Sequence, residues 1–195
     1  MMKLPLVLGS GSVFRRNLLE RLGLSFQTAP PDFDETPLPG EAAPDTALRL
    51  AEGKARSLAA RFPEALIIGA DQVAWCNGRQ LGKPMNTAAA QQMLADLSGR
   101  KIEFYSAMVL LNTATGRIQR HVDNTTVTMR TLDTAQIQRY LEREPDAVYC
   151  AGAAKSEGLG GALLERIDSS DPNALIGLPL FRLIDFLHNE GISIL

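Results

Sequence analysis

The chain opens on a stretch that reads Leu4-Pro5-Leu6-Val7-Leu8-Gly9-Ser10-Gly11-Ser12. Its apolar half predicts a short buried strand, and its Gly-Ser pairs predict a tight turn. Residues 14–22 follow, with apolar side chains at positions 14, 18, 19 and 22. This spacing is typical of a helix with one buried face. The stretch therefore predicts a strand, a turn and a helix in succession.

The rest of the chain continues the alternation of strands and helices. We expect strands at 25–29, 65–70, 101–112, 117–130 and 162–167, helices at 44–61, 86–97, 134–143 and 180–189, and a proline-rich loop at 30–40. Asn77-Gly78 predicts a hairpin turn. We interpret residues 1–195 as one α/β domain, with a mixed twisted sheet in two lobes around a cleft.

Composition narrows the class of protein. The chain has 195 residues, of which 45% are hydrophobic, and a net charge of -2. These values exclude disorder and give no overall field for a nucleic-acid polymer. Its apolar runs fall far short of the ~20 residues of a membrane crossing, so we expect a cytoplasmic protein with no membrane association. The chain has two cysteines and two histidines, and we expect no zinc cage of these residues.

The turn after the first strand is a candidate phosphate site. Ser10 and Ser12 offer hydroxyl groups, the helix that follows offers free backbone N–H groups, and Arg15 can fork onto phosphate oxygens. The alternative is that the serines only cap the helix and that the arginine is solvated. A dinucleotide-binding fingerprint is excluded because Phe14 occupies the third glycine position.

Four further charges are candidates for chemistry. Asp71 directly follows the expected buried strand 65–70, where open α/β sheets gather ligands. Lys83 lies in a stiff Gly-Lys-Pro loop, Lys54 lies within a helix, and Glu35 lies in the proline-rich loop. Each of these charges, taken alone, is also compatible with a solvated surface position.

In their order along the chain, these motifs resemble the Maf family of nucleoside triphosphate pyrophosphatases. The matching residues are Ser10-x-Ser12-x-x-Arg15-Arg16, Asp34-Glu35, Lys54-Ala55, Ile68-Gly69-Ala70-Asp71-Gln72, Leu81-Gly82-Lys83-Pro84, Leu97-Ser98-Gly99 and Gly177-Leu178-Pro179. The resemblance implies the α/β fold of inosine triphosphate pyrophosphatases, a homodimer, a divalent cation and hydrolysis of a nucleotide to its monophosphate and pyrophosphate. One departure is Val13, where the family usually has proline.

The resemblance also implies roles for the candidate residues. Asp71 matches the general base, and Ser10, Ser12, Arg15, Lys54 and Lys83 match groups that hold the substrate. Glu35 is the expected ligand of Mg²⁺ or Mn²⁺, and Asp71 is expected to share the ion. The residues alone do not separate the base from the ligand.

Three positions resemble the branch of the family that hydrolyses 7-methyl-GTP. They are Phe14, Gln72 and Glu157, where the branch acting on dTTP and UTP typically has Arg, Thr and Gln. We therefore expect specificity for 7-methyl-GTP. The alternatives are a broader house-cleaning enzyme that also accepts dTTP and UTP, and a non-catalytic nucleotide-binding regulator of septum formation. Phe14 is alternatively a core residue, and Glu157 a plain loop charge.

Overall fold

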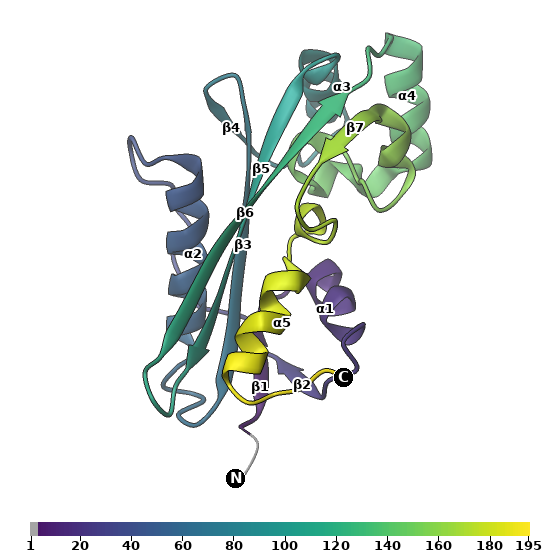
Figure 1. Ribbon diagram of the computed structural model, residues 1–195. Coiled ribbons are helices and arrows are strands. Elements are labelled where there is room, and N and C mark those ends of the chain that lie inside the picture. The colour runs from purple at the N-terminus through teal and green to yellow at the C-terminus, as the bar shows by residue number, and fades with distance from the viewer. Residues whose placement is uncertain (1–3) are drawn as a thin grey trace. The chain divides into compact units, whose positions relative to one another are not determined.

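One mixed sheet organises residues 4–195, the part of the chain that this computed structural model describes (Figure 1). Its strands are β1 (Leu6–Gly9), β2 (Phe26–Thr28), β3 (Leu66–Cys76), β4 (Arg79–Leu81), β5 (Lys101–Asn112), β6 (Ile118–Met129) and β7 (Leu164–Asp168). The order is β2-β1-β3-β5-β6-β7, and β4 pairs with β3. β1 runs parallel to β2 and β3, whereas β4 and β7 pair antiparallel to their neighbours. The expected mixed α/β sheet is confirmed.

Helices alternate with these strands largely as expected. They are α1 (Val13–Glu20), α2 (Ala43–Ser57), α3 (Thr87–Leu97), α4 (Thr134–Arg143) and α5 (Leu180–Asn189), with 3₁₀ turns at Pro145–Tyr149, Ala151–Ala153, Leu159–Leu163 and Ala174–Ile176. The expected bounds of α4 and α5 are confirmed. The expected end of α2 at residue 61 is wrong. Residues 58–61 instead form successive turns, which are closed by hydrogen bonds between residues three positions apart. Among residues 4–195, no helix has both the length and the apolarity that crossing a membrane requires.

The chain divides into two compact units. The first holds the described part of Met1–Gln72 together with Tyr105–Asp123 and Asp171–Leu195. The second holds Val73–Phe104 and Asn124–Ser170. Strands β3, β5 and β6 therefore contribute residues to both units. The expectation of one domain over the whole chain stays a prediction.

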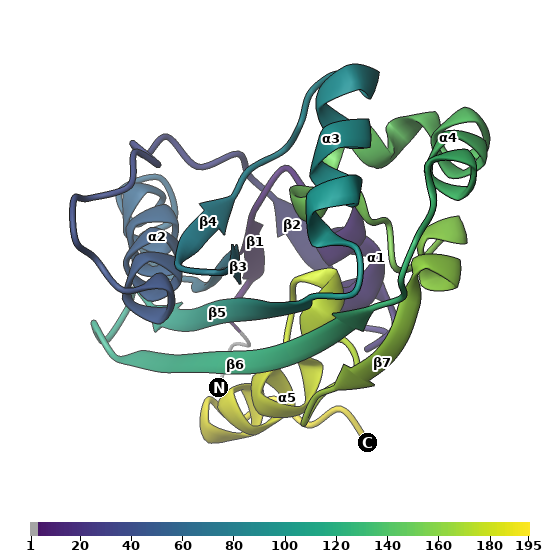
Figure 2. The ribbon, with the colours of Figure 1, turned by 90° about the horizontal axis from the view of Figure 1, so that it is seen from above.

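In the first unit, helices cover both faces of the sheet. Figure 1 shows α2 on one side of β1 and β3, and α1 and α5 on the other side. Side chains alternate between these faces along each strand. Leu8 and Ile68 point to α1 and α5, where they join an apolar core with Leu18, Leu183 and residues around them. Figure 2, viewed from above, again places α1 and α2 on different sides of β1.

On the opposite face, α2 approaches the strands unusually closely. A Cβ atom on Gly69 of β3 would overlap the carbonyl oxygen of Ala51 and press on Ala55. A Cβ atom on Gly9 of β1 would lie 3.0 Å from Leu58 Cδ1. Any side chain at position 69 would therefore force α2 away from the sheet. This close approach determines which residues of β3 the side chains of α2 can contact.

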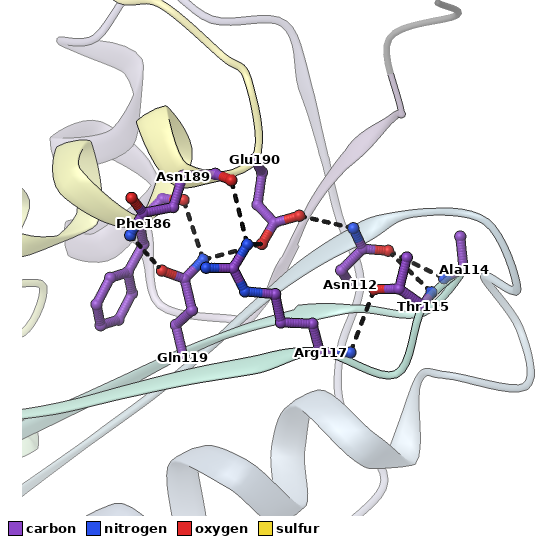
Figure 3. A network of polar contacts seen from close by, with 8 residues as sticks. All are labelled: Asn112, Ala114, Thr115, Arg117, Gln119, Phe186, Asn189 and Glu190. Carbon is purple, nitrogen blue, oxygen red and sulfur yellow. Dashed lines mark hydrogen bonds and ion pairs between the residues drawn. The ribbon is translucent and has the colours of Figure 1, made fainter.

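The end of α5 is fastened to the β5–β6 hairpin by polar side chains (Figure 3). Glu190 accepts hydrogen bonds from Asn112 Nδ2 at 2.7 Å and from Gln119 Nε2 at 3.0 Å, and lies 3.5 Å from Arg117 Nη1. Gln119 also accepts a hydrogen bond from Asn189 Nδ2. Because every partner in the network belongs to this unit, we interpret the network as structural.

The second unit begins with the hairpin of β3 and β4. Its turn residues, Asn77 and Gly78, both have positive φ, as the sequence predicts for a two-residue hairpin. Asn86 caps α3 by accepting a hydrogen bond from Ala89 N, and Asp133 caps α4 in a reciprocal capping box. Helix α3 packs against α4 and the 3₁₀ turn Ala151–Ala153.

Candidate active site

The turn between β1 and α1 is built around two serine hydroxyl groups. Ser12 is the N-cap of α1, and its Oγ accepts a hydrogen bond from Arg15 N at 3.4 Å. Ser10 is buried, and its Oγ accepts hydrogen bonds from Ser12 N at 3.1 Å and from Arg15 Nη1 at 3.3 Å. Ser12 thus has the capping role that the sequence left open, whereas Ser10 orients the arginine.

Arg15 is held from both ends of its guanidinium group. Nη1 contacts Ser10, and Nε donates a hydrogen bond of 2.9 Å to the carbonyl oxygen of Gly177, just before α5. Burial lowers the pKa of Arg15, while the negative charges of Asp71 and Glu35 act in the opposite direction. Arg15 is therefore a fixed, partly desolvated cation beside two carboxylates, which is a suitable group for binding phosphate.

Lys54 connects the two carboxylates. Its ammonium nitrogen donates hydrogen bonds to Asp71 Oδ1 at 2.6 Å and to Glu35 Oε2 at 2.8 Å. The side chains of Lys54 and Asp71 are 7% and 11% exposed, whereas that of Glu35 is 57% exposed. Asp71 and Lys54 thus form a buried pair, and Glu35 closes the group on the solvent side.

The position of Asp71 corrects one expectation from the sequence. The strand does not end at residue 70 but continues through Asp71 to Cys76. In the sequence, the adjacent polar residues Asp71 and Gln72 resemble the end of a buried strand. In the folded chain, each of them has a partner on its own face of the sheet, so the ladder continues without an unpaired polar group. Asp71 points to α2, on the same face as Gly69, and Gln72 points to the opposite face.

Gln72 is held by the segment that precedes α5. Its Nε2 donates hydrogen bonds to the carbonyl oxygens of Ala174 and Leu175, at 3.1 and 2.9 Å, and to Ser106 Oγ at 2.8 Å. Ser106 is fully buried and in turn donates to the carbonyl of Ala174. Because carbonyl oxygens only accept hydrogen bonds, the amide nitrogen must face this segment. The other hydrogen-bonding atom of the amide, Oε1, can only accept hydrogen bonds.

The proline-rich loop that carries Glu35 is fastened to α2. Arg49 of α2 donates two hydrogen bonds of 2.8 Å to the carboxylate of Glu41 and one of 3.3 Å to the carbonyl oxygen of Thr36. The hydrogen bonds from Arg49 lower the pKa of Glu41. The ring of Phe33 also lies so close to Gly53 that a Cβ atom there would overlap it. These contacts place Glu35 over Lys54.

Sequence reasoning missed the residues that support the loop and Gln72. They are Arg49, Glu41, Phe33 and Ser106. Arg49 and Glu41 are eight residues apart on either side of the start of a helix, a spacing that predicts no pairing. Ser106 lies directly before the apolar run 107–111 of β5, and a hydroxyl group at the edge of that run was the one available signal.

Phe14 lies at the surface of the first unit. Its side chain is on the first turn of α1, beside Arg15, and the residue is 37% exposed. The alternative of a buried core position for Phe14 is therefore not what the structure shows. An exposed aromatic face next to the turn of Ser10 and Ser12 is available for stacking.

Lys83 and Glu157 belong to the second unit, where both are exposed. The charges of both residues influence the pKa of the Cys150 thiol. Burial and the charge of Glu157 raise this pKa, and the charges of Lys155 and Lys83 lower it. The two charges therefore lie in one region of that unit. That they contact the same nucleotide as the residues of the first unit stays a prediction.

The acidic residues of the site can be examined as ligands of a divalent cation. Among residues 4–195, no three His, Cys, Asp or Glu side chains lie close enough together to hold a metal ion by themselves. Glu35 and Asp71 nevertheless direct carboxylate oxygens at one point, which the Lys54 ammonium occupies. Mg²⁺ is commonly bound by one or two carboxylates and completed by substrate phosphates and water. The acidic pair fits a cation of this kind.

The α/β fold and this arrangement of a serine-rich turn, an arginine and a lysine between two carboxylates are compatible with a nucleotide-binding protein. The chain belongs to the family of Maf-like proteins, which matches residues 5–190. The resemblance that the motifs indicated is thereby confirmed.

Full-length relatives carry one common name. A 7-methyl-GTP pyrophosphatase of Neisseria meningitidis serogroup A is 73% identical over 194 residues, covering 100% of this chain and 99% of the relative. Proteins of the same name from Chromobacterium violaceum and Methylobacillus flagellatus are 58% and 49% identical, and each alignment covers at least 97% of both chains. The structure of the Staphylococcus aureus Ham1 protein is 15% identical, covers 64% of this chain and 71% of that chain, and has a TM-score of 0.45, which is too low to support an argument.

Proposed function

We propose that this protein hydrolyses 7-methyl-GTP to 7-methyl-GMP and pyrophosphate. The observation that carries the proposal is the Lys54 ammonium between Asp71 and Glu35, beside Arg15, in a chain 73% identical to a protein named for this activity. The group combines cations for phosphate oxygens with a carboxylate that can accept a proton. Such a combination suits attack by water on a phosphate anhydride.

The proposed reaction uses Asp71 as general base. A water oxygen forms a bond to the α-phosphorus, the bond from that phosphorus to the bridging oxygen breaks, and pyrophosphate leaves. Asp71 accepts the proton of the attacking water. Lys54 holds Oδ1 of Asp71 and thereby fixes the direction of the carboxylate. Ser10, Ser12, Arg15 and Lys83 are proposed to bind the phosphate groups, whose charge their donors offset.

A divalent cation, Mg²⁺ or Mn²⁺, is proposed to bind with the substrate. When bound, it neutralises part of the charge of the triphosphate. Glu35 is the better placed ligand because its side chain is 57% exposed, and Asp71 is proposed to share the ion. Lys54 would then donate to whichever carboxylate oxygen the ion leaves free, and would keep both side chains oriented before the nucleotide arrives.

Base selection is proposed to use Phe14, Glu157 and Gln72. Methylation of guanine at N7 leaves a delocalised positive charge, which strengthens stacking on an aromatic face such as that of Phe14. The adjacent N–H donors of guanine can both bind to the carboxylate of Glu157. Gln72 is limited to accepting hydrogen bonds through Oε1, so a ribose hydroxyl or a base N–H group suits it best.

Two other functions remain as alternatives to this proposal. A broader enzyme would hydrolyse dTTP and UTP as well as 7-methyl-GTP, and a regulator of septum formation would bind nucleotides without hydrolysing them. We also expect a cytoplasmic homodimer, as the family resemblance implies. A panel of nucleotides assayed for pyrophosphate release separates the three functions directly.

Replacing Asp71 tests the general base. The Asp71→Asn variant should remain folded, because the amide oxygen can still accept from Lys54, but should lose about 100-fold or more in turnover of 7-methyl-GTP. Asp32→Asn, in the exposed loop before Glu35, removes the same charge and should retain normal turnover. Turnover of Asp71→Asn within a few-fold of the parent protein would remove Asp71 from the mechanism.

Removal of metal tests the proposed cation. Treatment with EDTA should abolish pyrophosphate release, and added Mg²⁺ or Mn²⁺ should restore it, because hard cations prefer carboxylate and phosphate oxygens. The Glu35→Gln variant should need a higher concentration of metal for half-maximal activity. If exhaustively chelated protein retained full activity, the phosphate charge would have to be offset by Lys and Arg alone.

Replacing Glu157 tests base selection. Glu157→Gln should lower kcat/KM for 7-methyl-GTP by at least about tenfold and affect dTTP or UTP little, since an amide cannot accept both guanine donors and carries no charge. Glu165→Gln on β7 is the matched control, because that carboxylate is also exposed and lies in the same unit. An unchanged ratio of 7-methyl-GTP to dTTP hydrolysis in Glu157→Gln would contradict the proposed contact while leaving the pyrophosphatase reaction intact.

A further inference from the structure

A single carboxylate binds both ends of the short segment that carries Glu157. Glu144, the C-cap residue of α4, accepts a hydrogen bond from Lys155 Nζ at 2.8 Å through Oε1. Through Oε2 it accepts a second hydrogen bond, from Leu159 N at 3.1 Å. Lys155 and Leu159 are the two ends of a five-residue segment with Glu157 at its middle. One side chain therefore holds both ends of this segment, Lys155–Leu159.

The start of the segment is fastened a second time, by Tyr140 of α4. The phenol oxygen accepts a hydrogen bond from Lys155 N at 3.1 Å and donates one of 3.2 Å to the carbonyl oxygen of Ala153. Tyr140 is buried, and burial raises its pKa to about 12, so the phenol keeps its proton at neutral pH. The backbone on which the segment begins is therefore fixed in position.

Two glycines allow the chain to approach Glu144 and fold back on itself. A Cβ atom on Gly158 would lie 2.6 Å from Glu144 Oε2, and one on Gly160 would lie 2.5 Å from the carbonyl oxygen of Lys155. A larger residue at either position would displace the segment from the carboxylate. The two glycines are therefore explained by the contact with Glu144 and by the tight turn that it closes.

Glu157 lies at the exposed tip of this turn. The residue is exposed, and its carboxylate accepts a hydrogen bond of 3.3 Å from Ser156 Oγ, its neighbour in the chain. Its direction consequently depends on the backbone that Glu144 and Tyr140 hold. A carboxylate that must meet two adjacent N–H donors needs such a fixed direction, because the strength of hydrogen bonds falls steeply with misalignment.

We infer that Glu144 is a positioning residue for base selection: it holds both ends of the segment Lys155–Leu159 and so directs Glu157 at the nucleobase. The inference rests on the proposed function, in which Glu157 binds the base. The hydrogen bond from Lys155 lowers the pKa of Glu144, and the hydrogen bond to Glu144 raises the pKa of Lys155. Both groups are thus charged at neutral pH, where the contact is strongest.

A purely structural role for Glu144 makes a different prediction. The Glu144 and Lys155 side chains are 17% and 21% exposed, and a partly solvated ion pair contributes little to the free energy of unfolding. If the pair only stabilised the fold, its loss would lower the melting temperature and reduce the hydrolysis of every nucleotide equally. A positioning role instead changes the ratio between nucleotides.

The test compares Glu144→Ala and Glu144→Gln with Glu142→Gln. Glu142 lies two residues earlier, in the last turn of α4, and is exposed. Glu142→Gln is the matched control because it removes the same charge as Glu144→Gln. We expect Glu144→Ala to lower kcat/KM for 7-methyl-GTP relative to dTTP by about fivefold or more, and Glu144→Gln, which keeps one acceptor, to lower it less. Inhibition by inorganic pyrophosphate, which has no base, should stay unchanged. Should Glu144→Ala fail to fold, Glu144→Gln alone decides the question.

A double variant separates this inference from the proposed function. Because Glu144 acts through Glu157, adding Glu144→Gln to Glu157→Gln should cause no further change in the ratio. An unchanged ratio in Glu144→Gln, an equal loss for both nucleotides, or multiplied effects in the double variant would overturn the inference. If Glu157→Gln alone left the ratio unchanged, the proposed role of Glu157 would fail, and the role of Glu144 with it.

Discussion

The contact on which the candidate site depends is the ammonium group of Lys54 between Asp71 and Glu35. A buried lysine is costly unless a carboxylate compensates it, so Lys54 and Asp71 must be brought together as the chain folds. This requirement constrains the neighbouring elements. Gly69 leaves room for the backbone of α2, which brings Lys54 level with Asp71 two residues further along β3. The small residues of β3 and α2 thus set the geometry of the charges.

Other contacts around Lys54 also fix charged groups in position. Arg49 holds the loop of Glu35 on α2, and Ser10 and Gly177 hold Arg15 on the other side of the carboxylates. A neutral hydroxyl group and a backbone carbonyl thus orient Arg15, and the ion pair of Arg49 with Glu41 orients the loop of Glu35, before any ligand binds. Electrostatic catalysis depends on such prior orientation, since groups that need not reorganise lower the barrier most.

Sequence patterns predicted the local structure well and the long-range contacts poorly. The bounds of α4 and α5 follow from apolar spacing and capping residues, and the hairpin at Asn77 follows from its turn residues. The strand end expected at Asp71 was wrong, because its partner Lys54 is 17 residues away and invisible to local patterns. The supporting roles of Arg49 and Glu144 were missed for the same reason. The sequence offered Lys54, Asp71 and Glu35 only as separate candidate charges, and the family resemblance implied roles for them. The structure then supplied the contact among these three.

The central claim, that water attacks the α-phosphorus of 7-methyl-GTP, is tested most directly by hydrolysis in water enriched in oxygen-18. Mass spectrometry of the products locates the solvent oxygen. The account predicts one labelled oxygen in 7-methyl-GMP and none in pyrophosphate, because the bond to the α-phosphorus is the one that forms. Label in pyrophosphate would place the attack at the β-phosphorus and contradict the account, as would release of inorganic phosphate with no pyrophosphate.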